Sequence, residues 1–134
     1  MKIDFQGKKY SIWWQHDRHL PVSQGYKVQE RNLTHCFIAE VGKENEMRWE
    51  GQASTWHLDT YVKKVGRKIA FDRAVRSFAY SLFCKKEEQA MEEMGIWDLE
   101  DPNNKFSMKF RIFRLELCTA MYGLYQQQCP KDFK

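Results

Sequence analysis

The sequence lacks the features of a membrane or exported protein. No apolar run approaches the roughly 20 residues that a transmembrane helix needs. The first ten residues, MKIDFQGKKY, contain no apolar segment of the kind found in signal peptides. We therefore expect a cytoplasmic protein with no membrane partner.

The four cysteines match neither a zinc site nor a disulfide framework. Cys36, Cys84, Cys118 and Cys129 are far apart, and none belongs to a Cys-x-x-Cys pair. In a cytoplasmic chain such cysteines are expected to be free, buried thiols. Cys129 precedes Pro130 in a polar tail and is expected to be the most exposed of the four.

Catalytic motifs are missing as well. There is no Gly-rich phosphate loop, no nucleophile elbow and no paired-carboxylate motif. A metal site built from His16, His19 and His35 would need ligands that the fold holds in place, but the first two fall in a predicted loop. Cys36 is not expected to act with His35, because neighbouring strand residues point to opposite faces. We expect no enzyme, no metal and no cofactor.

What is present describes one folded domain. Of 134 residues, 43% are hydrophobic and 15% aromatic, which is enough for one core. We predict a single α+β domain over residues 1–134, with a sheet in 1–57, a helical part in 58–128 and a short tail in 129–134. The net charge of +4 is mildly basic, so it permits an acidic partner without requiring one.

Alternating apolar and polar residues predict a β-hairpin over residues 2–15. A two-residue type II′ turn at Gly7-Lys8 would pair Phe5 with Tyr10 and Ile3 with Ile12. One apolar face then holds Ile3, Phe5, Tyr10, Ile12 and Trp14. Trp13 points to the other face, where it could anchor an interface.

Residues 16–32 show no stable period, and Pro21, Gly25 and Asn32 interrupt them. They predict a long loop with a short extended piece at 26–28, and long loops in compact domains are often functional.

Residues 33–56 predict a second hairpin that turns at GKENE. Pairing Ala39 with Trp49 and Phe37 with Gly51 places Glu40 opposite Arg48. Opposite charges across a ladder stabilise it by about 0.2–1 kcal/mol. The two hairpins form a four-stranded antiparallel sheet with one core face.

The period becomes helical from Leu58. One helix is predicted from Leu58 to about Phe83, and KKEEQAMEEM adds further turns that Gly95 ends. After a break at Pro102, a stripe at helical spacing contains Phe106, Phe110, Phe113, Leu117, Ala120 and Leu124. The start of this segment also alternates like a strand. We favour a helix because the spacing continues past Leu117.

The segment VKKVGRKIAFDRAVRSF, residues 62–78, combines a helical period with six basic residues. At about 100° per residue, the side predicted to pack on the sheet consists of Leu58, Tyr61, Val62, Val65 and Ile69. Lys63, Lys64 and Arg67 share the opposite side, which is either plain solvated surface or a patch for phosphates or carboxylates. Gly66 predicts a close backbone approach.

Two further basic residues of this segment, Arg73 and Arg76, fall on the side predicted to meet the sheet. We expect them to be partly buried and paired, Arg76 with Asp72 and Arg73 with an acid elsewhere.

Residues 51–75, GQASTWHLDTYVKKVGRKIAFDRAV, resemble small proteins encoded by bacteriophages and prophages, of mostly unassigned function. In these, a hairpin precedes a helix with an aspartate–aromatic–Lys-x-x-Gly-Arg-Lys-hydrophobic-Ala pattern. The matching residues are Gly51, Ala53, Asp59, Tyr61, Lys64, Gly66, Arg67, Lys68, Ile69, Ala70, Arg73 and Ala74. The resemblance implies a phage setting and a sheet-plus-helix domain, and it does not extend beyond Cys84. Small accessory phage proteins are often inhibitors of host enzymes or defence systems.

We therefore expect a non-enzymatic phage accessory protein that binds and inhibits a host protein, one of anti-phage defence, in the cytoplasm of the host cell. The partner surface would be acidic or mimic nucleic acid. The sequence leaves open whether the chain forms a homo-oligomer. Two alternatives remain: a nucleic-acid-binding module that uses the basic helix, and a binder of a small phosphorylated ligand or nucleotide signal. The residues expected to contact the partner are Lys63, Lys64, Arg67, Trp13, Arg18, Tyr26, Lys27 and Arg31.

Overall fold

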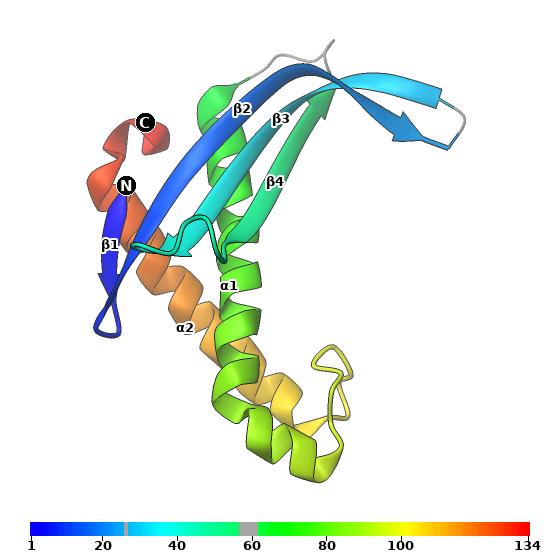
Figure 1. Cartoon of the computed structure of the whole chain (residues 1–134), viewed down its shortest axis with the longest axis vertical. Coiled ribbons are helices and arrows are strands. Elements are labelled where there is room, and N and C mark those ends of the chain that lie inside the picture. Colours follow the sequence, from blue (N-terminus) through cyan, green and yellow to red (C-terminus); the bar gives the residue numbers. More distant parts are fainter. Residues whose placement is uncertain (26, 57–61) are drawn as a thin grey trace.

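The computed structural model describes residues 1–25, 27–56 and 62–134, and it shows an α+β fold (Figure 1). The antiparallel sheet has the strand order β1-β2-β3-β4. Its strands are β1 (Lys2–Phe5), β2 (Lys8–Gln24), β3 (Lys27–Glu40) and β4 (Trp49–Trp56). The helices are α1 (Lys63–Met94), α2 (Lys105–Gln128) and the short 3-10 helix η1 (Pro130–Phe133). The long α1 packs on the sheet, so the predicted fold class is confirmed.

β1 and β2 form the first hairpin, but in another register than predicted. Ile3 pairs with Tyr10 and Phe5 with Lys8, because the turn is Gln6-Gly7 and not Gly7-Lys8. Both turn residues have positive φ, 50° and 78°, which is typical of a type I′ turn. The shift is by two residues, so every side chain keeps its face and the predicted apolar face is right.

The long loop predicted for residues 16–32 is wrong. β2 continues to Gln24, and it pairs with β3 as far as the Gln24–Lys27 pair. In the described part of the chain, β4 pairs with β3 only as far as Arg31. The far end of the hairpin therefore projects from the sheet as a two-stranded ribbon (Figure 1). Pro21 suggested a loop, but β1 has already ended there, so β2 is an edge strand and tolerates a missing N–H.

β3 and β4 pair one residue away from the predicted register. Ile38 lies opposite Trp49, and Cys36 lies opposite Gly51. A shift by one residue exchanges the two faces of one strand relative to the other. Trp49 and Gly51 keep the core face as predicted, but in β3 it is Ile38 and Cys36 that face the helices, and Phe37 lies on the other side of the sheet.

The predicted pair of Glu40 and Arg48 is also wrong. Glu40 lies 3.7 Å from the Nζ atom of Lys43 in the β3–β4 loop. The Arg48 guanidinium instead lies over the ring of Phe37, 4.9 Å from its centre. The reason is the shape of the connection. Gly42 has a φ of 91°, and turns at residues 41–47 take the place of a hairpin turn confined to GKENE.

α1 is one continuous helix of 32 residues. It ends at Gly95 as predicted, in the left-handed conformation with φ 65°. The predicted start at Leu58 lies outside the described residues. α2 is helical from Lys105 onward, and the Asn104 side chain accepts a hydrogen bond from the N–H of Phe106. The helical interpretation of this segment is therefore confirmed.

Small residues determine which side of α1 meets the sheet. A Cβ atom on Gly51 would lie 2.2 Å from the carbonyl oxygen of Ala70 and 2.2 Å from the nitrogen of Ala74. A Cβ atom on Gly66 would lie 2.8 Å from Oγ1 of Thr34, so the predicted close approach is confirmed. Helix and strands touch here almost backbone to backbone.

This close contact rotates α1 away from the predicted orientation. Val62, Val65 and Ile69 were expected beneath the sheet, but they are 41%, 44% and 40% exposed. They lie beside β4, in a groove that Ala53 and Thr55 also line. Arg73 was expected to be partly buried and paired with an acid. It is exposed, and it donates a hydrogen bond to the carbonyl oxygen of Gln52.

Arg76 is exposed too, but its Nε lies 3.0 Å from the carboxylate of Asp72, so that predicted ion pair is confirmed.

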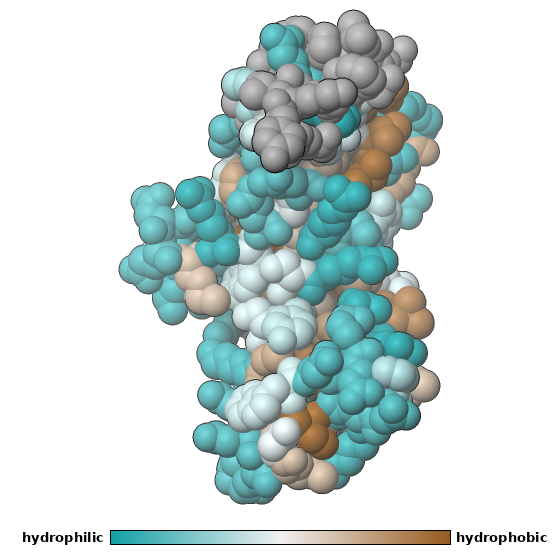
Figure 2. Space-filling model, turned by 90° about the vertical axis from the view of Figure 1, so that its right-hand side faces the viewer, coloured by the Kyte–Doolittle hydropathy of each residue, from teal (hydrophilic) through white to brown (hydrophobic). Residues whose placement is uncertain are grey.

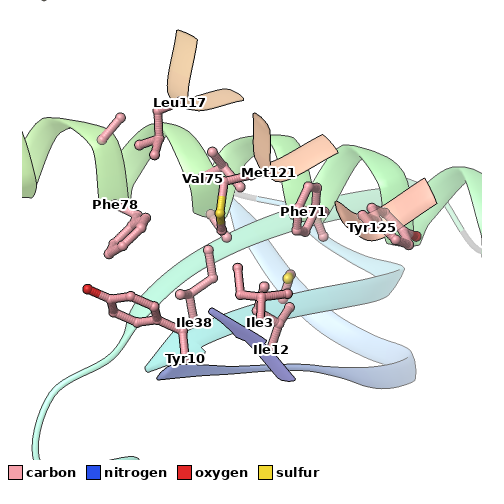
Figure 3. Packing of buried hydrophobic residues seen from close by; sticks show 14 of the residues in the cluster. Ile3, Tyr10, Ile12, Ile38, Phe71, Val75, Phe78, Leu117, Met121 and Tyr125 are labelled. Atoms are coloured by element: carbon pink, nitrogen blue, oxygen red, sulfur yellow. The ribbon is translucent and has the colours of Figure 1, made fainter. Parts of the chain in front are cut away.

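The main core lies between the sheet and the two helices (Figure 3). The α1 side chains Phe71, Val75 and Phe78 contribute most to it. The sheet supplies Ile3, Tyr10, Ile12 and Ile38, and α2 supplies Leu117, Met121 and Tyr125. A second, smaller cluster joins the far ends of the helices; its buried residues are Phe83, Met91, Leu99, Phe106 and Phe110.

All four cysteines are free thiols. Cys36 is fully buried, whereas Cys84, Cys118 and Cys129 are half-buried. Cys129 was predicted to be the most exposed of the four, but it belongs to the same burial class as Cys84 and Cys118. Among the described residues, neither helix combines the length and apolar character needed to cross a membrane.

Candidate functional site

The first turn of α1 carries two exposed lysines, Lys63 and Lys64. This turn contains no acidic residue, and Val62 at the N-cap position provides no side-chain cap. The N-terminus of a helix is the positive end of its dipole, so a cation there is unfavourable, by about 0.3–1 kcal/mol. Nζ of Lys64 donates a hydrogen bond to the main-chain oxygen of Lys134. Local preferences of this kind are commonly broken where a side chain serves binding and not folding.

Strand β2 adds a cation next to these lysines. Burial lowers the pKa of His16, and the positive charges of Lys63, Arg67 and Arg18 lower this pKa further, against the opposing effect of Asp17. Charges act on a pKa in this way only at short range, so Arg18 and Lys63 each lie near His16. His16 stays uncharged at neutral pH, and the positive potential comes from lysine and arginine.

Strand β3 carries two more of the predicted contact residues. Lys27 begins β3, and Arg31 pairs with Trp56 at the last position of β4. α1 begins shortly after β4 ends, so its lysines lie at the same end (Figure 1). We call Lys63, Lys64, Arg18 and Arg31 the basic end; Lys27 lies apart from them in the chain trace, at the far tip of the ribbon (Figure 1). Tyr26, also predicted to contact the partner, lies outside the described residues.

Arg67 is not part of the exposed face where it was predicted. Only 22% of its side chain is exposed, and its Nε donates a hydrogen bond to Oδ2 of Asp132 at 2.8 Å. Its guanidinium lies over the ring of Trp14, 4.0 Å from the centre. The reason is that η1 folds back and covers this side of α1. Burial alone would lower the pKa of Arg67, but Asp132 raises it, so Arg67 is a structural cation.

Trp13 lies on the helix-free face of the sheet, as predicted. Its ring stacks on Phe37 of β3 with 5.3 Å between ring centres, and Arg48 lies on Phe37 as well. Trp13 is half-buried by these contacts. It therefore belongs to the face of the sheet and not to the basic end.

The same face carries a network that the sequence did not predict. His35 contacts Asp17 through Nε2 at 3.1 Å and Glu50 through Nδ1 at 2.7 Å. Although burial raises the pKa of Glu50, its hydrogen bond with His35 helps to lower it. Both ring nitrogens are engaged by carboxylates, so the ring presents no nitrogen to a substrate. The predicted β3–β4 register, which pairs Phe37 with Gly51, would turn His35 toward the core, so this network did not follow from the sequence pattern.

A run of acidic residues lies at the opposite end of the molecule. Residues 87–101 contain seven acidic residues and no basic one. They follow α1 to its C-terminal end, and a helix of 32 residues is about 48 Å long. The start of α2 brings Lys105 and Lys109 to the same end, and Lys109 pairs with Glu87, so this end carries charges of both signs.

Metal chemistry finds no support in the parts of the chain that the structure describes, where no group of three His, Cys, Asp or Glu side chains could hold an ion. Comparison of the chain with models of known protein families, with curated proteins and with solved structures gives no match. The phage resemblance therefore stays a prediction.

Proposed function

We propose that this chain is a non-enzymatic binding protein that uses its basic end to occupy and block an acidic surface of another protein. The observation that carries the proposal is the pair of exposed lysines, Lys63 and Lys64, at the positive end of α1. They weaken the helix locally, and an acidic partner would neutralise them. The resemblance to phage accessory proteins supplies the setting, in which the partner is a host protein of anti-phage defence.

The charge distribution supports a protein partner that is met in one orientation. Exposed lysines gather at one end of a long helix, whereas the other end carries charges of both signs, so an acidic partner attracts one end of the molecule above the other. Such complementarity mainly raises the association rate and the specificity.

Nucleic acid is a second candidate, and the ribbon is the observation that favours it. A two-stranded β-ribbon fits the major groove of duplex DNA. Here the ribbon projects from the sheet with Arg18, Lys27 and Arg31 on it or at its base. Binding of this kind would depend steeply on salt.

The test is the double variant Lys63→Glu and Lys64→Glu. Because two acids replace two cations at the helix N-terminus, the free energy of unfolding should stay equal or rise, by up to about 1 kcal/mol. Partner binding should weaken at least tenfold, mainly through slower association. Denaturant melts give the first quantity and surface plasmon resonance the second.

The matched control is Lys85→Glu with Lys86→Glu, the same change at two exposed neighbouring lysines of the same helix. Pull-downs from host lysate should recover one stoichiometric protein with the wild type and the control, and lose it with the Lys63/Lys64 variant. A 20-base-pair duplex, titrated at several salt concentrations, tests the second candidate. A folded Lys63/Lys64 variant that keeps every partner would rule out both.

A further inference from the structure

The outer edge of β4 is open in the described part of the chain. β4 pairs with β3 alone and forms one edge of the sheet. The carbonyl of Gln52 points away from β3, since it accepts a hydrogen bond from Nη1 of Arg73 at 2.6 Å. Main-chain groups alternate in direction along a strand, so Ser54 and Trp56 also direct their N–H and C=O groups outward. An open edge is a template for another strand.

An apolar groove runs along this edge. It lies between β4 and the first turns of α1, has a volume of about 180 Å³, and is lined by Ala53, Thr55, Val62, Val65 and Ile69 among others. Small-molecule sites are usually about 300–1,000 Å³, so this groove suits one or two side chains and not a cofactor. Figure 2 looks onto this side of the molecule, and brown hydrophobic atoms lie at the right of its upper half, below the grey atoms.

Arg73 closes one end of the groove. Its guanidinium already donates a hydrogen bond to the carbonyl oxygen of Gln52. A strand that pairs with Ser54 and Trp56 therefore has to end before Gln52. The remaining N–H groups of an exposed guanidinium bind a carboxylate well. A chain that ends at Arg73 meets it with its terminal carboxylate and runs antiparallel to β4.

We propose that the edge of β4 and this groove bind the C-terminal segment of a partner protein as an added strand. The backbone of the segment pairs with Ser54 and Trp56. Alternate side chains enter the groove against Val65 and Ile69, and the terminal carboxylate binds Arg73. This is strand addition combined with capture of a chain terminus. One end of the groove, at Val62, adjoins the basic end, but strand pairing and the carboxylate site at Arg73 use none of the basic-end residues, so the proposal does not depend on their function.

Charge favours this occupant over a second copy of the chain. Two copies joined along β4 would bring the Arg73 side chains and the basic first turns of α1 toward one another. Like charges at an interface disfavour association. A carboxylate at the same place is attracted.

The experiment uses two display libraries of random ten-residue peptides, selected on the immobilised full chain. One library ends in a free C-terminus, and the other continues into a Gly/Ser spacer. The proposal expects enrichment from the first library only, with apolar residues at alternate positions counted from the terminus. No enrichment, or equal enrichment from both libraries, would overturn it.

An enriched peptide is then synthesised and measured by fluorescence polarisation. Converting its carboxylate to an amide should weaken binding at least tenfold, and this arm needs no protein variant. Ile69→Glu and Arg73→Ala should each weaken binding about tenfold or more. Ile112→Glu is the matched control, because Ile112 is an exposed isoleucine of α2, and it should leave binding unchanged. Equal binding of acid and amide contradicts the proposal.

Two further measurements distinguish this groove from the basic end and from a homodimer interface. The Lys63/Lys64→Glu variant should bind the peptide within about threefold of the wild type. Loss of partner binding with retained peptide binding therefore separates the proposal for the basic end from the proposal for this groove. A wild-type dimer in sedimentation that Ile69→Glu dissociates would assign the groove to a second copy and overturn the proposal.

Discussion

Gly51→Ala is expected to destabilise the protein by about 3 kcal/mol or more, the upper part of the range for overpacked cores. The added Cβ would lie 2.2 Å from main-chain atoms of both Ala70 and Ala74. Neither neighbour is a flexible side chain, so α1 itself has to move off β4. Since small domains are stable by only about 5–15 kcal/mol, urea denaturation should show a large shift of the midpoint.

Gly123→Ala is the control for this change. Gly123 lies inside α2, and nothing lies within 4 Å of the added Cβ. The same substitution should there stabilise the protein by about 0.8–1 kcal/mol through helix propensity. If Gly51→Ala cost less than 1 kcal/mol, the backbone contact between α1 and β4 would be wrong.

Arg67→Ala is expected to lower the free energy of unfolding by about 2–4 kcal/mol. It removes a charged hydrogen bond to Asp132 and the contact with the Trp14 ring. It also leaves the carboxylate of Asp132, which is only 15% exposed, without its cation. Lys63→Ala, at an exposed position four residues earlier, should stay within about 0.5 kcal/mol. Equal small losses would contradict the assignment.

The stability of the Arg67→Ala variant should also depend on pH differently from that of the wild type. Burial would raise the pKa of Asp132, but the hydrogen bond from Tyr125 and the charge of Arg67 lower it overall. A carboxyl with a lowered folded pKa contributes stability above its unfolded value, about 3.9, and loses it as the pH falls through the folded value. Urea midpoints between pH 7 and pH 2.5 should therefore fall more steeply for the wild type than for Arg67→Ala. Parallel curves would mean that this ion pair does not form.

The sequence predicted the faces of the strands better than their pairing. Alternation identified the core faces of β1, β2 and β4, because period two decides which side chains share a side. The register depends on turn geometry, which alternation does not contain: at Gln6-Gly7 the error was two residues, and at the β3–β4 loop it was one. The second error mattered more, since it moved His35 and Phe37 to the wrong face.

The ribbon escaped prediction for a related reason. In the described part of the chain the two strands pair only with each other at the far end, beyond the last β3–β4 pair, and Pro21 is allowed on an edge. In α1, the apolar stripe at Val62, Val65 and Ile69 suggested the wrong buried side. Three-dimensional contact through Gly51 and Gly66 decided the rotation of the helix.

The candidate site was predicted in part. Exposure of Lys63 and Lys64 follows from helical geometry alone, and the structure agrees. Arg67 shares that face in a helical wheel, but its partner Asp132 is 65 residues away and belongs to η1. A contact at that distance along the chain leaves no local pattern in the sequence.

The two hydrophobic clusters have a consequence for how the molecule opens. The main cluster joins segments that are far apart in the chain, whereas the cluster around Phe83, Leu99 and Phe110 joins only the neighbouring ends of α1 and α2. Local contacts form quickly and with little loss of chain entropy. A smaller core of this kind also separates from the rest at lower cost. We therefore expect the paired ends of α1 and α2, with the turn between them at residues 95–104, to unfold and refold as a unit while the sheet stays folded.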